Sequence, residues 1–166
     1  MAIEFGNGTS LSNAMVCSWR ITSGFNGAQN PINVNWERAD NTLHGNNYTN
    51  VLTESSGVFT FASTGWYLVT WEHYIQSSVD SVWNEMQMAL STNSGSNWQS
   101  VGYAQAYSIS GNTRYVIASK THSFKISDTS TQRMRFGVNV NNTSVTTAGS
   151  TSQQFTGFTI AKVADV

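Results

Sequence analysis

Large and polar side chains alternate most clearly between Gly57 and Gln76, where two β-prone runs flank a short break at residues 62–65. A period of two directs one set of side chains of a strand into a core. That set consists of Phe59, Phe61, Tyr67, Val69, Trp71, His73 and Ile75. The intervening positions Trp66, Leu68 and Tyr74 are also large and apolar. A strand with apolar side chains on both faces is typically buried on both, so the second face is predicted to cover another sheet or another subunit.

Similar short runs recur along the rest of the chain, separated by clusters of Gly, Asn and Ser that favour turns. Helix signals are scarce, although Asp80 to Leu90 could hold a helical turn. The pattern predicts an all-β sandwich or barrel. Its expected strands are Ala14–Thr22, Ile32–Trp36, Tyr48–Thr53, Gly57–Phe61, Gly65–Gln76, Asn84–Ser91, Gln99–Tyr107, Arg114–Ile126, Gln132–Asn139 and Gln153–Val163.

Composition narrows the classes of partner. The 166 residues suit one domain, and only 10% of them are charged, against about 25% in typical soluble proteins. Eight Lys and Arg residues and nine Asp and Glu residues give a net charge of -1, without a basic stripe. We therefore expect neither nucleic acid nor a membrane as partner. The start of the sequence lacks the features of a secretion signal, which predicts a soluble protein made in the cytoplasm. The single cysteine, Cys17, is expected to be a small buried apolar residue.

Two groups of spaced residues carry a resemblance to a known family. The first group is Asn47, Leu52, Phe59, Gly65 and Tyr67. The second follows about ninety residues later in the closing run, at Phe155, Gly157 and Phe158. Their order and spacing resemble the signature of the C1q/TNF-like jelly roll. A weaker match lies between them at Ser123–Asp128, where that family has a strand running into a tight turn.

This resemblance implies a two-sheet antiparallel jelly-roll sandwich that forms a homotrimer around a threefold axis. One sheet of each subunit, including the strand at Gly65–Gln76, would face the neighbouring subunits. The expected trimer interface is Trp66, Leu68, Trp71, His73 and Tyr74. Residues 14–166 would form the jelly-roll domain, and residues 1–13, which are polar and contain glycine, would form an N-terminal arm that orders on a partner.

Catalytic and metal-binding motifs are missing from the sequence. The three histidines, His44, His73 and His122, form no recognised motif with the acidic residues, among them Glu85 and Asp128. We therefore expect no enzyme activity, no cofactor and no metal site. Three copies of His73 on a threefold axis could bind a metal ion or an anion, but a hydrogen-bonded interface histidine is the favoured interpretation.

Four further aromatic residues allow two interpretations. Trp83, Trp98, Tyr103 and Tyr107 could stack on sugars in a lectin-like site, or they could belong to the core of the outer sheet. The second interpretation is the favoured one at this stage.

The composition of the sequence, with few charges and many Ser, Thr and Asn residues, resembles that of structural proteins of tailed bacteriophages. The leading hypothesis is a capsid decoration (cement) protein, located on the virion surface, whose trimers bind the major capsid protein and stabilise the shell. The alternative is a receptor-binding knob of a tail or head fibre, with glycans as one class of ligand. A C1q-like module with no connection to a virion is a third hypothesis.

Overall fold

The computed structural model describes residues 15–33, 35–39, 51–108 and 113–166. Within these ranges it contains twelve strands and no helix, which confirms the predicted all-β class. The strands are β1 (Met15–Ile21), β2 (Phe25–Asn26), β3 (Trp36–Arg38), β4 (Leu52–Ser55), β5 (Val58–Phe61), β6 (Gly65–Ser77), β7 (Ser81–Ser91), β8 (Gln99–Ser108), β9 (Arg114–Ile126), β10 (Arg133–Val140), β11 (Thr146–Thr147) and β12 (Gly157–Ala164).

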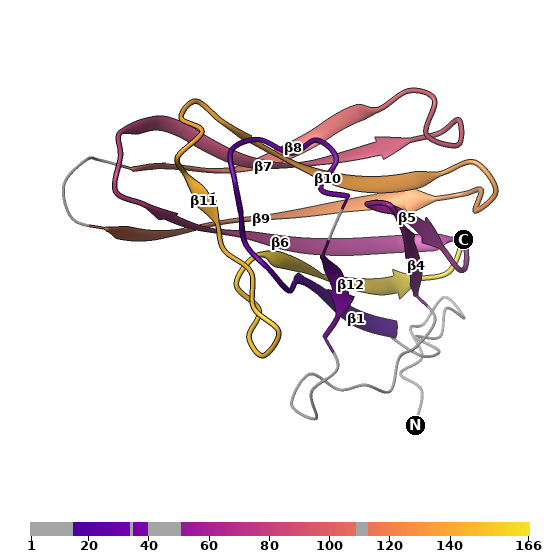
Figure 1. The fold of residues 1–166 in the computed structure, drawn as a ribbon. Helices are drawn as coiled ribbons and strands as arrows, with labels where there is room; N and C mark the ends of the chain where they lie inside the picture. The colour runs from indigo at the N-terminus through magenta and orange to yellow at the C-terminus, as the bar shows by residue number, and fades with distance from the viewer. Residues whose placement is uncertain (1–14, 34, 40–50, 109–112) are drawn as a thin grey trace.

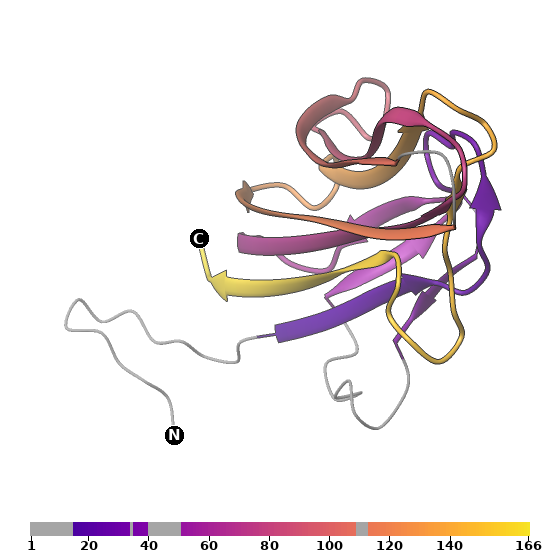
Figure 2. The same ribbon diagram turned by 90° about the vertical axis from the view of Figure 1, so that its left-hand side faces the viewer.

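The strands form two antiparallel sheets that stack face to face, as Figures 1 and 2 show. In the first, here called sheet I, β6 pairs with β9 along one edge and with β12 and β11 along the other. β1 and β3 continue the sheet beyond β12, and β2 continues it beyond β11. Sheet II has the order β4-β5-β10-β7-β8. The chain changes sheet at six connections, β3 to β4, β5 to β6, β6 to β7, β8 to β9, β9 to β10 and β10 to β11, as expected for the winding of a jelly roll.

Strand β6 shows the predicted alternation. It is paired with β9 over its whole length, from Gly65 opposite Ile126 to Ser77 opposite Arg114. Every second side chain is buried between the sheets: Tyr67, Val69, Trp71, His73 and Ile75. The intervening side chains, from Trp66 to Gln76, are exposed or half-buried on the exterior face of sheet I. The two faces of this strand therefore have different environments within a single subunit.

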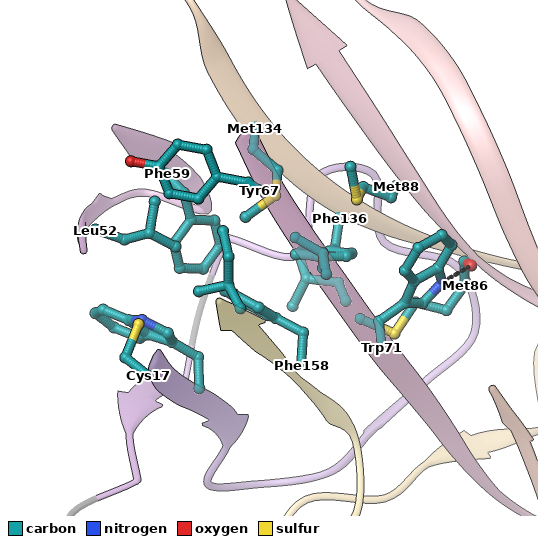
Figure 3. Packing of buried hydrophobic residues seen from close by; sticks show 14 of the residues in the cluster. Cys17, Leu52, Phe59, Tyr67, Trp71, Met86, Met88, Met134, Phe136 and Phe158 are labelled. Carbon is teal, nitrogen blue, oxygen red and sulfur yellow. Dashed lines mark hydrogen bonds between the residues drawn. The ribbon is translucent and has the colours of Figure 1, made fainter. Parts of the chain in front are cut away.

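Aromatic rings fill the space between the sheets, as Figure 3 shows. Phe158 of β12 lies 4.9 Å from Phe59 of β5 and 4.7 Å from Phe136 of β10, measured between ring centroids. The Trp71 indole N–H donates a hydrogen bond of 2.9 Å to the backbone carbonyl of Met86 on the facing sheet. Edge-to-face and offset contacts of this kind add to the stabilisation that burial of the rings provides.

Most residues of the predicted signature are part of this core or pack against it. Leu52, Phe59, Tyr67 and Phe158 are buried, and the Tyr67 hydroxyl donates a hydrogen bond of 2.7 Å to the Ser63 carbonyl. Asn47 lies outside the described residues. Phe155 differs from the expectation, because it precedes β12 and is only half-buried.

The two signature glycines are explained by close approach of the backbone. A Cβ at Gly65 would lie 2.6 Å from the Ala164 carbonyl oxygen, so the turn into β6 leaves no room for a side chain. At Gly157 the obstacle is the carbonyl oxygen of Trp19 on the neighbouring strand β1. The role expected for a glycine at this position, close packing of rings, is thus replaced by close packing of two strands.

Three segments differ from the strands predicted from the sequence. Ile32 lies in a connection outside the named strands, where its N–H donates to the Phe136 carbonyl at 2.8 Å, and the strand begins only at Trp36. The segment considered for a helical turn, Asp80 to Leu90, is mostly strand β7. The two-residue strands β2 and β11 carry no detectable alternation, because a period of two needs a longer run.

Candidate interaction surfaces

The exterior face of sheet I carries exposed apolar side chains from four regions of the sequence. Trp66 and Leu68 of β6 are 45% and 40% exposed, although both lie within a central strand. The other exposed members, from β1, β9 and β12, are Val16, Tyr115, Ile117 and Val163. Half-buried Tyr74 lies on the same face of β6. Large apolar side chains grouped on an accessible sheet typically mark a contact surface.

Trp71 and His73, which were expected at the same interface, do not lie on this face. Both side chains are 0% exposed in the single subunit, and they point between the sheets. The assignment was wrong for these two residues because adjacent residues of a strand point to opposite faces. Trp66, Leu68 and Tyr74 remain predicted interface residues.

Hydroxyl groups occupy the middle of the exterior face and hydrogen-bond to one another. The side-chain oxygens of Thr70 and Thr121 are 2.9 Å apart, and those of Ser18 and Thr159 are 2.8 Å apart. These pairs satisfy hydroxyls that would otherwise require water, so covering this part of the face has a small polar cost. Toward the end of β6, the Tyr74 ring stacks on Phe155 with centroids 4.7 Å apart.

His73 is a neutral structural histidine. Its Nε2 lies 3.0 Å from the Thr147 hydroxyl, which ties β6 to β11, and its Nδ1 is buried without a hydrogen-bond partner among the described residues. Burial lowers the pKa of His73 from 6.5 to about 3, because the charged imidazolium would lose its hydration. The histidine is hydrogen-bonded, as the favoured interpretation expected, but its partner lies in the same subunit and its position at an interface was wrong.

The other candidate groups for chemistry are engaged in turns and packing. The carboxylate of Asp128 accepts hydrogen bonds from Ser130 and Thr131, and the Ser130 hydroxyl contributes most to lowering its pKa to about 2. Glu85 accepts a bond of 3.1 Å from the Asn139 side chain. Burial raises the pKa of the Cys17 thiol to about 11, so it remains protonated near neutral pH. These groups serve the fold and form no nucleophile–base pair with one another.

The described ranges contain no group of three or more His, Cys, Asp and Glu side chains that could hold a metal ion. His44 lies outside these ranges. Nor does this part of the chain contain a helix long and apolar enough to cross a lipid bilayer.

The exterior face of sheet II carries the four aromatic residues that had two interpretations. Tyr103 and Tyr107 of β8 are 48% and 68% exposed, and Trp83 and Trp98 are half-buried. All four rings lie outside the cluster of residues that packs between the sheets. The favoured interpretation, membership of an outer-sheet core, is therefore wrong, because no further layer of the described chain covers this face.

A shallow pocket of about 240 Å³ lies at the edge of the sandwich, where β8 passes into β9. It is lined by Tyr107, Ser108, Arg114, Tyr115 and Val116. The pocket adjoins both exterior faces, since Tyr107 belongs to sheet II and Tyr115 to sheet I.

Comparison of the sequence with protein-family models and with curated proteins finds no match. Comparison of the structure with solved structures does find similar folds. The structure of Eiger TNF from S. frugiperda superposes with a TM-score of 0.65 and 15% identity, covering 93% of this chain and 96% of that one. Murine APRIL at pH 5.0 gives a TM-score of 0.64 and 10% identity, covering 90% of this chain and 99% of that one.

The fold is a TNF-like jelly roll. This agrees with the resemblance that the signature residues carried, and at such low identity the likeness shows the fold alone. The superpositions cover 93% and 90% of this chain, so the TNF-like unit here includes both sheets.

Proposed function

We propose that this chain is a non-enzymatic structural protein of a virion, that it forms a homotrimer through the exterior face of sheet I, and that the trimer decorates the capsid by binding the major capsid protein. The observation that carries the proposal is the exposed apolar surface around Trp66, Leu68 and Tyr74 on a central strand of a TNF-like fold. A surface of this kind favours assembly over catalysis.

A threefold ring requires each subunit to present two different, complementary surfaces to its neighbours. The exterior face of sheet I offers rings and branched side chains at both ends of β6, with paired hydroxyls between them. Within the same face, Ile117 and Tyr115 on edge strand β9 form a second group of apolar side chains beside those of β6. Glu72 is the one carboxylate of β6 on this face, so the trimer must leave it in water or pair it with a cation of the neighbour.

The capsid role is supported by composition and by symmetry. A neutral surface rich in Ser, Thr and Asn resembles that of phage virion proteins. A trimer would contact three capsid subunits at once, so that three weak contacts act together. The arm at residues 1–13 lies outside the described residues, and its ordering on a capsid remains a prediction.

Assembly is tested by Tyr74→Asp, with Tyr74→Phe as the matched control. The carboxylate would replace a ring that stacks on Phe155, at the surface where neighbours meet, and burying it there would leave an unpaired charge. We expect sedimentation to show a trimer for the wild type and for Tyr74→Phe at micromolar concentration, and smaller species for Tyr74→Asp. A monomeric wild type, or a Tyr74→Asp trimer of unchanged stability, would refute the proposed interface.

The capsid role needs a separate measurement. Purified protein should bind expanded, undecorated capsids at a fixed ratio and raise the temperature at which they rupture. If a protein that is trimeric by sedimentation has no affinity for capsids, the decoration role is refuted while the trimer stands.

The second candidate function is a receptor-binding knob on a fibre. The exposed rings on the exterior face of sheet II favour it, because a purely structural clamp has no need of four aromatic residues there. Binding to host cells in the absence of capsid affinity would support this role over decoration.

A further inference from the structure

The exterior face of sheet II combines aromatic rings with side-chain amides. Register places Gln87 of β7 directly opposite Tyr103 of β8, and Glu85 opposite Gln105. Paired side chains of an antiparallel sheet lie about 5 Å apart, and those two residues apart on one strand lie about 7 Å apart. The Tyr103 ring is thus flanked by the amides of Gln87 and Gln105. We call Trp83, Gln87, Trp98, Tyr103, Gln105 and Tyr107 the outer aromatic face.

Charged side chains on the strands of this face contact other groups of the same chain. Glu85 accepts a hydrogen bond from Asn139, and the Arg135 guanidinium lies 4.4 Å from the centre of the Trp98 ring. Arg133 donates to the backbone carbonyls of Thr129, Ser130 and Gln132. β8 itself contains no charged residue. The exposed groups of β8 that a ligand would meet are therefore rings, amides and hydroxyls, all of them neutral.

We propose that the outer aromatic face is a binding site for neutral saccharides, with Tyr103 as its central ring. One face of a pyranose carries C–H groups that pack against the electron-rich face of an aromatic ring. Its hydroxyl groups both donate and accept hydrogen bonds, and side-chain amides do the same. Gln105 is exposed, and Gln87 keeps its amide N–H₂ available while its oxygen accepts a bond of 3.3 Å from Ser100.

Other classes of ligand match this surface less well. A nucleic acid or an acidic polymer requires several exposed basic groups, whereas β8 has none and the two arginines of β10 are half-buried, one over the Trp98 ring and one bonded to backbone carbonyls. An amphipathic helix requires a continuous apolar groove, whereas Gln105 separates the two tyrosines of β8, and Trp83 of β7 is followed on this face by Glu85 and Gln87. A neutral polyhydroxylated ligand matches both the rings and the amides.

The site is compatible with the proposed trimer. Sheet II lies on the other side of the core from the exterior face of sheet I, so three outer aromatic faces would point away from the assembly (Figure 2). Three weak sites on one particle bind a surface that displays many copies of a sugar far more tightly than one site does. The inference deepens the attachment role and does not depend on capsid binding, which a separate experiment tests.

The test uses the full chain and defined oligosaccharides. Maltotriose, lactose, mannotriose and chitotriose serve as neutral probes, with sialyllactose and heparin as anionic ones. Binding is measured per subunit by titration calorimetry and by the change in intrinsic tryptophan fluorescence, to which Trp83 and Trp98 contribute among the six tryptophans of the chain. We expect at least one neutral probe to bind at millimolar concentration or below. Tyr103→Ala should weaken that binding about tenfold, within the range that one aromatic contact contributes, whereas Tyr103→Phe should retain most of it.

A second pair of variants separates binding from folding. Gln105→Ala should weaken binding of the same probe, and Gln153→Ala, which removes an exposed amide from the connection between β11 and β12, should not. Urea denaturation of each variant checks that the fold is intact. The proposal is overturned if no neutral probe binds at 10 mM, if only sialyllactose or heparin binds, or if Tyr103→Ala and Gln105→Ala bind as the wild type does.

Discussion

Replacing Trp71 with alanine should destabilise the subunit itself, because this indole lies between the sheets and not at an interface. The ring is 0% exposed, its centroid lies 6.1 Å from that of Phe136, and its N–H donates to the Met86 carbonyl across the core. The same substitution at a surface contact would leave the isolated subunit nearly unchanged. Trp71 therefore tests the orientation of β6 directly.

The expected magnitude follows from burial and from the hydrogen bond. Truncating a buried Trp to Ala removes about 3–5 kcal/mol, which includes the cost of the cavity that remains. Loss of the hydrogen bond adds about 1 kcal/mol. The sum is a large part of the roughly 5–15 kcal/mol that stabilises a typical domain. Trp71→Phe, which keeps a ring but lacks the donor, should lose about 1–2 kcal/mol and gives a folded variant to measure.

Urea unfolding followed by circular dichroism gives the free energy of unfolding, and sedimentation at several concentrations gives the state of assembly. Both are needed at matched protein concentration, because assembly itself stabilises the folded subunit. Leu68→Ala is the matched control on the opposite face of β6, where the side chain is 40% exposed. We expect Trp71→Phe to lower the unfolding midpoint without releasing subunits, and Leu68→Ala to weaken assembly with a smaller effect on the isolated subunit.

The opposite pattern would refute the reasoning. If Trp71→Phe releases subunits while its unfolding midpoint at low concentration equals that of the wild type, the indole contacts a neighbour and the inward orientation is wrong.

Two further predictions concern pH and backbone packing. The pKa of His73 is about 3 in the folded state and about 6.5 in the unfolded state, so the unfolded chain takes up the proton first as the pH falls. The contribution of this group to the free energy of unfolding is therefore complete above pH 6.5. It should decrease by up to about 1.4 kcal/mol per pH unit between pH 6.5 and about pH 3. Urea midpoints at pH 7, 5.5 and 4.5 should fall less steeply for His73→Gln, and parallel slopes would contradict the prediction. Gly157→Ala should cost about 1–3 kcal/mol, because the added methyl would meet the Trp19 carbonyl and push β1 from β12. Gly102→Ala, where the nearest atom is the edge of the Trp71 ring at 3.2 Å, is the milder control, and equal midpoints for Gly157→Ala and the wild type would show that the strands can separate freely.

Local pattern was sufficient to predict the long strands of the sandwich. β6 and β9 each span thirteen residues, and both were expected nearly as they occur, because a long alternating run can be assigned without knowing its neighbours. The buried signature residues Phe59, Tyr67 and Phe158 were placed correctly for the same reason. The alternation within one strand could not predict which residues far apart in the sequence would contact each other. The contact between His73 and Thr147 joins residues 74 positions apart, and the two-residue strand β11 that provides it has no pattern of its own.

Errors at the candidate interface arose from grouping residues by type instead of by position. Trp71 and His73 have the same parity as Tyr67 and Val69, so the alternation already placed them in the buried set. Trp66, Leu68 and Tyr74 have the opposite parity, and each is exposed or half-buried. Strict use of parity would have predicted a smaller exterior set, with the same three residues that remain as candidates.

The outer aromatic face shows a different limit of sequence reasoning. Tyr103 and Tyr107 alternate with Ala104 and Ala106 along β8, which predicts two faces but does not say which face is covered. Ala104 and Ala106 share the inward face with Gly102, where an added Cβ would already lie 3.2 Å from the Trp71 ring, so the space on this side suits small side chains. The larger tyrosines are thereby left on the outside. In this sandwich the size of one buried indole on β6 helps to decide that the rings of β8 face solvent, so the core and the proposed saccharide site are consequences of the same packing.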